Sequence, residues 1–313
     1  MAQTVLKSPK TPVPPTSLQP DPPQSTPEVT QPKPSLVRRA PRRRGTLLQR
    51  ISVIVAATFL LVVIIAAFAP GLLAPGDPYT GNTANILQAP NSAHWFGTDH
   101  LGRDLYTRVV HGTALSLRTA LIAVTIALVS GSLFGLLAGF LGGWVDQAVM
   151  RVVDVLLAIP SLLLSLALIS ALGFGSTNVA IAVAIGSVAT FARIARSESL
   201  RVCQAAYVEA ARAMGSRWYV TLFRHVVPNS AGPIIALAVL EFGMAILSVS
   251  ALSFLGYGAP RPAPEWGSLI SEGRNYLAAA GWLTTLPGLV IAATVLAVNR
   301  LARSVGATGG KFS

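Results

Sequence analysis

The sequence predicts an all-α membrane protein with six transmembrane helices. Hydrophobic residues make up 52% of its 313 residues and charged residues only 12%, which is about half the charge of a typical soluble domain. Residues 51–69, 119–141 and 155–192 contain no charged side chain. Because about 20 apolar residues in a helix cross a hydrocarbon layer of about 30 Å, several such runs indicate an integral membrane protein.

The N-terminal segment, residues 1–46, is predicted to be a disordered, Pro-rich tail with a basic end. Residues 1–37 are rich in Pro, Ser, Thr and Gln and contain no aromatic side chain, so little apolar burial can offset the entropy of ordering. Nine of the 24 Lys and Arg residues lie before residue 51. Such a cluster beside a membrane helix marks its cytoplasmic side, which predicts that the N-terminus is inside.

The first apolar run is predicted to be a retained helix. It lies far from the N-terminus and ends at Ala69-Pro70, without the small-residue site of a cleaved signal. The run 155–192 is too long for one span, and the turn residues at 173–178 divide it into two helices. The six spans are therefore predicted at residues 51–69, 113–141, the two halves of 155–192, 228–256 and 281–301.

This order of spans places both termini and the polar segment 193–227 in the cytoplasm. It gives a membrane domain over residues 47–303 and a short cytoplasmic tail over 304–313. Of the 24 Lys and Arg residues, 19 fall inside and five outside, which is the bias that this orientation requires. The distribution argues against a nucleic-acid partner and favours contact with lipid headgroups. The five outside are Arg103, Arg108, Arg118, Arg261 and Arg274.

Glycine recurs every four residues in the second predicted span, at Gly131, Gly135 and Gly139. These residues share one helix face and allow a neighbouring backbone to approach closely. Tight packing within the chain is the favoured interpretation, and a contact with another subunit is the alternative.

The segment 193–227 gathers charge and aromatic side chains within an otherwise apolar chain. Its first half predicts a short helix that ends at Gly215, a residue suited to the left-handed position after a helix. Glu209 and Arg212 are three residues apart and can pair on the exposed side. The residues at helical spacing in this half are Tyr207, Ala210, Ala211 and Met214.

The second half of the segment, SRWYVTLFRHVV, predicts another short amphipathic helix, after which Pro228 begins the fifth span. Two short helices joined at a glycine would form a compact surface for a partner protein. On spacing alone, they could equally lie along the lipid interface.

The string EAARAMG, followed by VTLFRHVVPN, resembles the EAA signature of the permease subunits of bacterial ABC importers. The resemblance extends in order from about residue 47 to residue 300, and it is to the "C" type subunits of the dipeptide, oligopeptide and nickel permease group. The segments that carry it include HWFGTDHLGRDLYTRVVHGTALSL, GGWVDQAVMRVVDVLLAIPSLLL, LSFLGYGAP and PEWGSLI.

This resemblance implies a MetI-like permease fold in the bacterial inner membrane. It implies half of a translocation pathway for di- or oligopeptides, with nickel or another small solute such as glutathione or haem as the alternative. The implied partners are a "B" type permease, one or two ABC ATPase subunits and an extracytoplasmic substrate-binding protein. The EAA loop would dock on the ATPase through Tyr207, Glu209, Ala210, Ala211, Met214 and Gly215.

No catalytic or cofactor site is predicted in this chain. The Gly310-Lys311 pair lacks the spacing of a phosphate-binding loop, so ATP and Mg²⁺ are expected on partner subunits. One cysteine and four scattered histidines give no metal-ligand spacing, and no nucleophile lies at motif spacing from a histidine. The chain is therefore predicted not to be an enzyme.

Two sets of polar residues are candidates for function. Asp99 and Asp104 flank Arg103 in the predicted outer segment 70–112, where they would either order the loop by internal ion pairing or contact the binding protein. Glu241 is the acidic residue within the fifth span, where an ionised side chain is costly. The favoured interpretation is a structural hydrogen bond or ion pair with the partner permease, or a protonated carboxyl group in a dry site. The alternative is a carboxylate that lines the translocation cavity.

Overall fold

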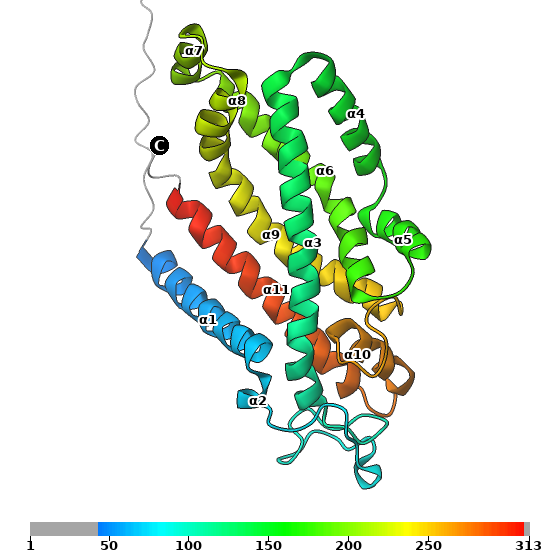
Figure 1. Cartoon of the computed structure of the whole chain (residues 1–313). Coiled ribbons are helices and arrows are strands. Elements are labelled where there is room, and N and C mark those ends of the chain that lie inside the picture. The colour runs from blue at the N-terminus through cyan, green and yellow to red at the C-terminus, as the bar shows by residue number, and fades with distance from the viewer. Residues whose placement is uncertain (1–42, 310–313) are drawn as a thin grey trace, which may run out of the picture. The chain divides into compact units, whose positions relative to one another are not determined.

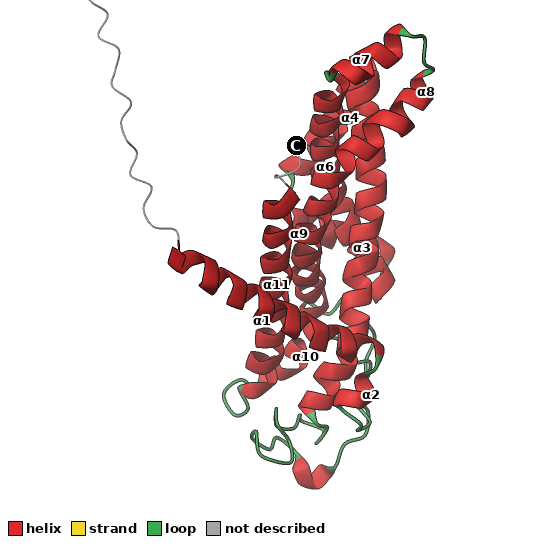
Figure 2. Ribbon diagram, turned by 90° about the vertical axis from the view of Figure 1, so that its left-hand side faces the viewer, coloured by secondary structure: helices red, strands yellow, loops and turns green. Residues whose placement is uncertain are grey.

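The computed structural model describes residues 43–309, and the side chains of residues 50–304 among them. Nearly all of the predicted tail 1–46 lies outside the described residues, and so does the end of the predicted tail 304–313. The regular structure of the described part is helical throughout (Figures 1 and 2).

Five helical segments are long and apolar enough to cross a membrane, and a bent pair of helices can provide a sixth span. The long helices are α1 (Arg43–Phe68), α3 (Leu105–Leu141), α6 (Ser176–Cys203), α9 (Val227–Phe254) and α11 (Trp282–Gly309). The bent pair is α4 (Gly143–Ala158) and α5 (Ser161–Leu172). The short helices are α2 (Pro70–Leu73), η1 (Thr83–Asn85), α7 (Ala206–Ala213), α8 (Trp218–Thr221), η2 (Leu222–Val226), α10 (Trp266–Gly273) and η3 (Arg274–Tyr276).

Helix α3 begins eight residues before the predicted start of the second span. The Asp104 side chain accepts a hydrogen bond from the backbone N–H of Thr107 and caps the helix, as a carboxylate at this position commonly does. The helix then runs for 37 residues, about 55 Å at 1.5 Å per residue. It is therefore longer than the hydrocarbon layer, and its first turns lie beside a polar loop.

The predicted third span is not a continuous helix. Helix α4 already begins at Gly143, and the chain breaks at Ile159-Pro160 before α5, with an angle of 95° between the two helices. Ile159 is extended (φ −96°, ψ 129°) because the residue before a proline avoids the helical region. The predicted boundary after α5 is confirmed, since Gly173 and Gly175 both have positive φ.

Helices α3 and α6 approach each other backbone to backbone along the three glycines. A Cβ atom on Gly131 would lie 2.6 Å from the Val188 carbonyl oxygen of α6, and one on Gly135 would lie 2.2 Å from that of Ala192. The third position, Gly139, meets α6 one turn further along. This contact confirms the prediction of close packing within the chain.

The segment 193–227 is less separate from the long helices than predicted. Helix α6 continues to Cys203, and α8 passes through the π-helical turn η2 directly into α9. Pro228 explains the wide turn, because it lacks the N–H of a regular helix and its ring crowds the preceding turn. The N–H of Val227 reaches back to the Leu222 carbonyl instead. The second predicted amphipathic helix is therefore the first part of one continuous helical segment.

Helix α10 is anchored on α3 at the end of the helices opposite to α7 (Figure 1). Trp266 is fully buried, and its indole N–H donates to the Val109 carbonyl oxygen at 3.0 Å. Its backbone N–H donates to the Ser116 hydroxyl. These two bonds fix the beginning of α10 against the first turns of α3.

Candidate functional site

Helix α7 and the start of α8 form an exposed surface at one end of the long helices (Figure 1). Gly215 ends α7 with φ +79°, and the N–H of Ser216 bonds to the Ala211 carbonyl oxygen. The predicted helix end is therefore confirmed. Large apolar side chains project from this surface, with Met214 82% exposed. We call this set the α7–α8 surface: Tyr207, Met214, Trp218, Tyr219 and Phe223.

Two of the expectations for this segment are wrong. Ala211 is only 6% exposed, and Val208, one turn earlier, is fully buried. Ala211 therefore lies on the face of α7 that packs against the rest of the chain and not on its outer face. Arg212 does not pair with Glu209. Its guanidinium lies 4.9 Å from the centre of the Phe140 ring, and its Nη2 is 3.5 Å from the Cys203 sulfur.

The remaining predicted residues lie on the outside of the helix. Tyr207, Glu209, Ala210, Met214 and Gly215 are exposed in the described chain. An exposed apolar cluster of this kind, rimmed by charged side chains, is typical of a protein interaction site. The geometry is compatible with docking of another protein on α7.

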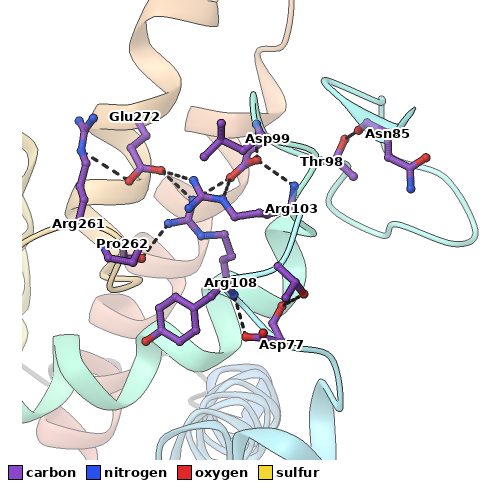
Figure 3. A network of polar contacts seen from close by, with 12 residues as sticks. Asp77, Asn85, Thr98, Asp99, Arg103, Arg108, Arg261, Pro262 and Glu272 are labelled. Atoms are coloured by element: carbon purple, nitrogen blue, oxygen red, sulfur yellow. Dashed lines mark hydrogen bonds and ion pairs between the residues drawn. The ribbon is translucent and has the colours of Figure 1, made fainter. Parts of the chain in front are cut away.

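A network of buried charges lies at the opposite end (Figure 3). Arg103 Nε donates to the Asp99 carboxylate at 2.7 Å, and Arg108 Nη1 donates to the same carboxylate at 2.8 Å. Both guanidinium groups also bond to Glu272 of α10, at 3.2 and 2.7 Å. The side chains are at most 6% exposed. Two carboxylates and two guanidinium groups therefore balance each other at a buried position.

The surrounding donors of this network lower the pKa of Asp99. Burial by itself would raise it, but hydrogen bonds from the backbone N–H groups of Arg103 and Leu101, together with the Arg103 guanidinium, hold the pKa of Asp99 below its usual value. The carboxylate form is therefore the one that the loop stabilises.

The internal ion pairing expected of the outer loop is present, since Asp99 and Arg103 are paired and buried against each other. Contact of this loop with a binding protein stays a prediction. Asp104 caps α3, and its carboxylate lies 2.9 Å from His94 Nδ1 with a quarter of the side chain exposed. Sequence reasoning missed Arg108 and Glu272 as members of this network, because nothing local marks a pair 164 residues apart.

The same cluster does not favour a metal ion. Ligand atoms of Asp99, His100 and Glu272 lie within 4.8 Å of one another. However, two buried guanidinium groups already neutralise both carboxylates, and their positive charge opposes a cation.

Glu241 lies half-buried on α9, where it faces α6. The Ser187 side chain of α6 lies near its carboxyl group. The structural role of Glu241 and its place in the translocation cavity therefore both stay predictions.

Sequence reasoning also missed a cavity of about 390 Å³ between the end of α9, the α5–α6 loop and α10. Glu265 is 1% exposed and lies behind the cavity wall. Its carboxyl oxygens accept hydrogen bonds from two lining residues, the Ser253 hydroxyl and the Ala259 N–H, both at 2.8 Å. Burial outweighs these bonds and raises the pKa of Glu265 above its ordinary value. Folding alone brings these residues together.

Comparisons with known proteins agree with this architecture. The family described as "binding-protein-dependent transport system inner membrane component" matches residues 131–306. The dipeptide transport system permease protein DppC of Alkalihalophilus pseudofirmus is 42% identical over 80% of this chain and 81% of its own length. The glutathione transport system permease protein GsiD of Pectobacterium atrosepticum is 40% identical over 82% and 86%.

A third relative and a solved structure complete the comparison. The probable D,D-dipeptide transport system permease protein DdpC of Escherichia coli (strain K12) is 41% identical over 80% of this chain and 83% of its own. A chain in the inward-facing MetNI methionine ABC transporter aligns with a TM-score of 0.50 and 16% identity, over 63% of this chain and 96% of that one. At this identity the solved structure supports the helical fold alone.

Proposed function

The chain belongs to the family of binding-protein-dependent transport system inner membrane components, and from this premise we propose that it forms half of the pathway of an ABC importer for di- or oligopeptides. The observation that carries the proposal is the exposed α7–α8 surface at one end of a bundle of apolar helices. A second, "B" type permease would supply the other half of the pathway. An extracytoplasmic binding protein would deliver the solute.

The proposed orientation places the α7–α8 surface and both termini in the cytoplasm of a bacterial inner membrane. Arginines gather at this end of the described chain, whereas Arg103 and Arg108 at the opposite end are buried in ion pairs. This asymmetry is the positive-inside bias of membrane proteins. The cytoplasmic arginines are Arg151, Arg193, Arg196, Arg201, Arg212, Arg217 and Arg224.

Coupling would pass from a partner ATPase to the permease through α7. The ATPase would contact the exposed face that holds Tyr207, Glu209, Ala210, Met214 and Gly215, while Ala211 and Val208 hold α7 to the bundle. Helix α7 follows α6 directly, and α8 continues into α9. A push on α7 would therefore move two long helices together. ATP and Mg²⁺ would be bound by the ATPase subunits.

Glutathione is the second candidate solute, because a relative named for glutathione transport is about as similar as those named for dipeptides. Nickel and haem remain the other alternative solutes that the sequence resemblance implies. Uptake assays on the reconstituted importer with its binding protein separate the candidates: uptake of peptides supports the proposal, and uptake of glutathione alone would replace it.

We expect Gly215→Val to uncouple the importer. A β-branched residue at φ +79° is strained by roughly 1–3 kcal/mol, so the end of α7 should rearrange. Peptide uptake and peptide-stimulated ATP hydrolysis should fall severalfold while the chain still inserts in the membrane. Gly215→Asn is the matched control, because asparagine tolerates this conformation. Full uptake and ATPase activity in Gly215→Val would contradict the coupling role.

Glu241→Gln should leave assembly and uptake unchanged. The amide has nearly the same shape, can still hydrogen-bond to a neighbour such as Ser187 and removes only the charge, so a structural role survives the change. The alternative, in which Glu241 lines the translocation cavity, is tested by comparing the uptake of peptides with a free and with a blocked amino terminus. A loss confined to amino-terminated or cationic solutes would show instead that Glu241 lines the translocation cavity.

A further inference from the structure

The cavity beside α10 is built where two loops meet. The backbone N–H of Gly175, between α5 and α6, donates to the Tyr257 carbonyl oxygen at 3.1 Å, and the Phe174 and Tyr257 rings stack with their centres 5.6 Å apart. These contacts join the α5–α6 loop to the segment that follows α9. The lining includes Arg261 and the hydroxyl-bearing residues Ser253, Ser268 and Ser271.

Arg261 carries a charge that the neighbouring network does not neutralise. Arg103 and Arg108 already balance Asp99 and Glu272. Arg261 is 71% exposed, and its Nε forms a longer ion pair, at 3.8 Å, with the second Glu272 oxygen (Figure 3). Three guanidinium groups therefore face two carboxylates, and the surplus positive charge and the outer N–H donors of Arg261 lie at the rim of the cavity.

The hydroxyl groups of the cavity differ in what they can offer a solute. Ser253 donates to the Glu265 carboxyl group and Ser268 to the Glu265 carbonyl oxygen, so both donors are occupied. Ser271 has no hydrogen-bond partner within the described part of the chain and keeps its donor. Since burial favours the uncharged form of Glu265, this residue leaves the charge of Arg261 largely uncompensated.

We propose that this cavity binds a carboxylate of the incoming solute, with Arg261 as the charged donor and Ser271 as a second donor. A guanidinium group pairs with a carboxylate through two parallel hydrogen bonds. The size of the cavity, about 390 Å³, is at the lower end of small-molecule sites, which suits the terminal residues of a peptide. The identification of the solute as a peptide, through its C-terminal carboxylate, rests on the proposed function.

Thiol labelling of the assembled importer tests the charge of the cavity. Ala259→Cys, at a lining position that is not one of the proposed donors, is introduced with Cys203→Ser, which removes the chain's own cysteine, and is labelled with an anionic and a cationic methanethiosulfonate. We expect the anionic reagent to react severalfold faster. Arg261→Gln should abolish this preference and Arg261→Lys should keep it. Arg274→Gln, an exposed arginine that does not line the cavity, should also keep it.

Protection by ligands then tests the solute. A dipeptide with a free C-terminal carboxylate should slow labelling, its C-terminally amidated form should not, and Arg261→Gln should remove the protection. Acetate as a competitor distinguishes a general carboxylate site from one that requires the peptide. Equal protection by both dipeptides, or a charge preference that survives Arg261→Gln, would overturn the proposal.

The outcomes separate this site from the proposed function. Selective protection without peptide uptake would leave the carboxylate site in place and refute peptide import. Normal peptide uptake without any protection would refute the site alone.

Discussion

Gly135→Ala should prevent the stable accumulation of the folded chain in the membrane. The added Cβ atom would lie 2.2 Å from the Ala192 carbonyl oxygen, and a backbone atom of α6 cannot move aside as the end of a side chain can. Helices α3 and α6 would have to separate along their principal contact. Because overpacking a close helix contact typically costs about 1–3 kcal/mol or more, we expect a large fall in membrane-inserted protein and in Tm in detergent.

The matched control is Gly232→Ala in α9. No heavy atom lies within 4 Å of its Cβ position, and alanine favours a helix by about 1 kcal/mol over glycine. This variant should accumulate normally and unfold at the same temperature or slightly higher. Wild-type abundance and Tm in Gly135→Ala would contradict the close approach of α3 and α6.

Arg108→Met should strongly destabilise the end of the chain that holds α10. The change removes one buried guanidinium and leaves Asp99 and Glu272 to share Arg103. Loss of one partner of a buried ion pair costs about 3–5 kcal/mol. The Tm of the purified chain in detergent should fall accordingly. Arg274→Met, at an exposed position, should change stability by no more than about 0.5 kcal/mol.

A double variant tests whether the charges act as one unit. Arg108→Met combined with Glu272→Gln removes one charge of each sign and leaves the Asp99–Arg103 pair intact. It should be more stable than the sum of the two single changes predicts, because the single variants each leave an unbalanced buried charge. Additive effects within about 0.5 kcal/mol would show that the four groups are not coupled.

The sequence by itself determined the features that depend on neighbouring residues. The charge-free runs predicted the membrane helices, and the cluster around Gly173 predicted the break between α5 and α6. Gly215 predicted the end of α7, and the glycine repeat predicted the close face of α3. Each signal is local, because helix periodicity, turn conformation and hydropathy are properties of consecutive residues.

The tertiary structure decided which of these residues meet and which of them remain accessible. It turned Ala211 inward, drew Arg212 to Phe140, and brought Glu272 to Arg108 across 164 residues of the sequence. It also created the cavity at whose rim Arg261 is the third guanidinium group beside two carboxylates. Burial and pairing depend on the three-dimensional arrangement of distant segments, and a carboxylate or guanidinium has the same local sequence signal whether it faces solvent or another charge.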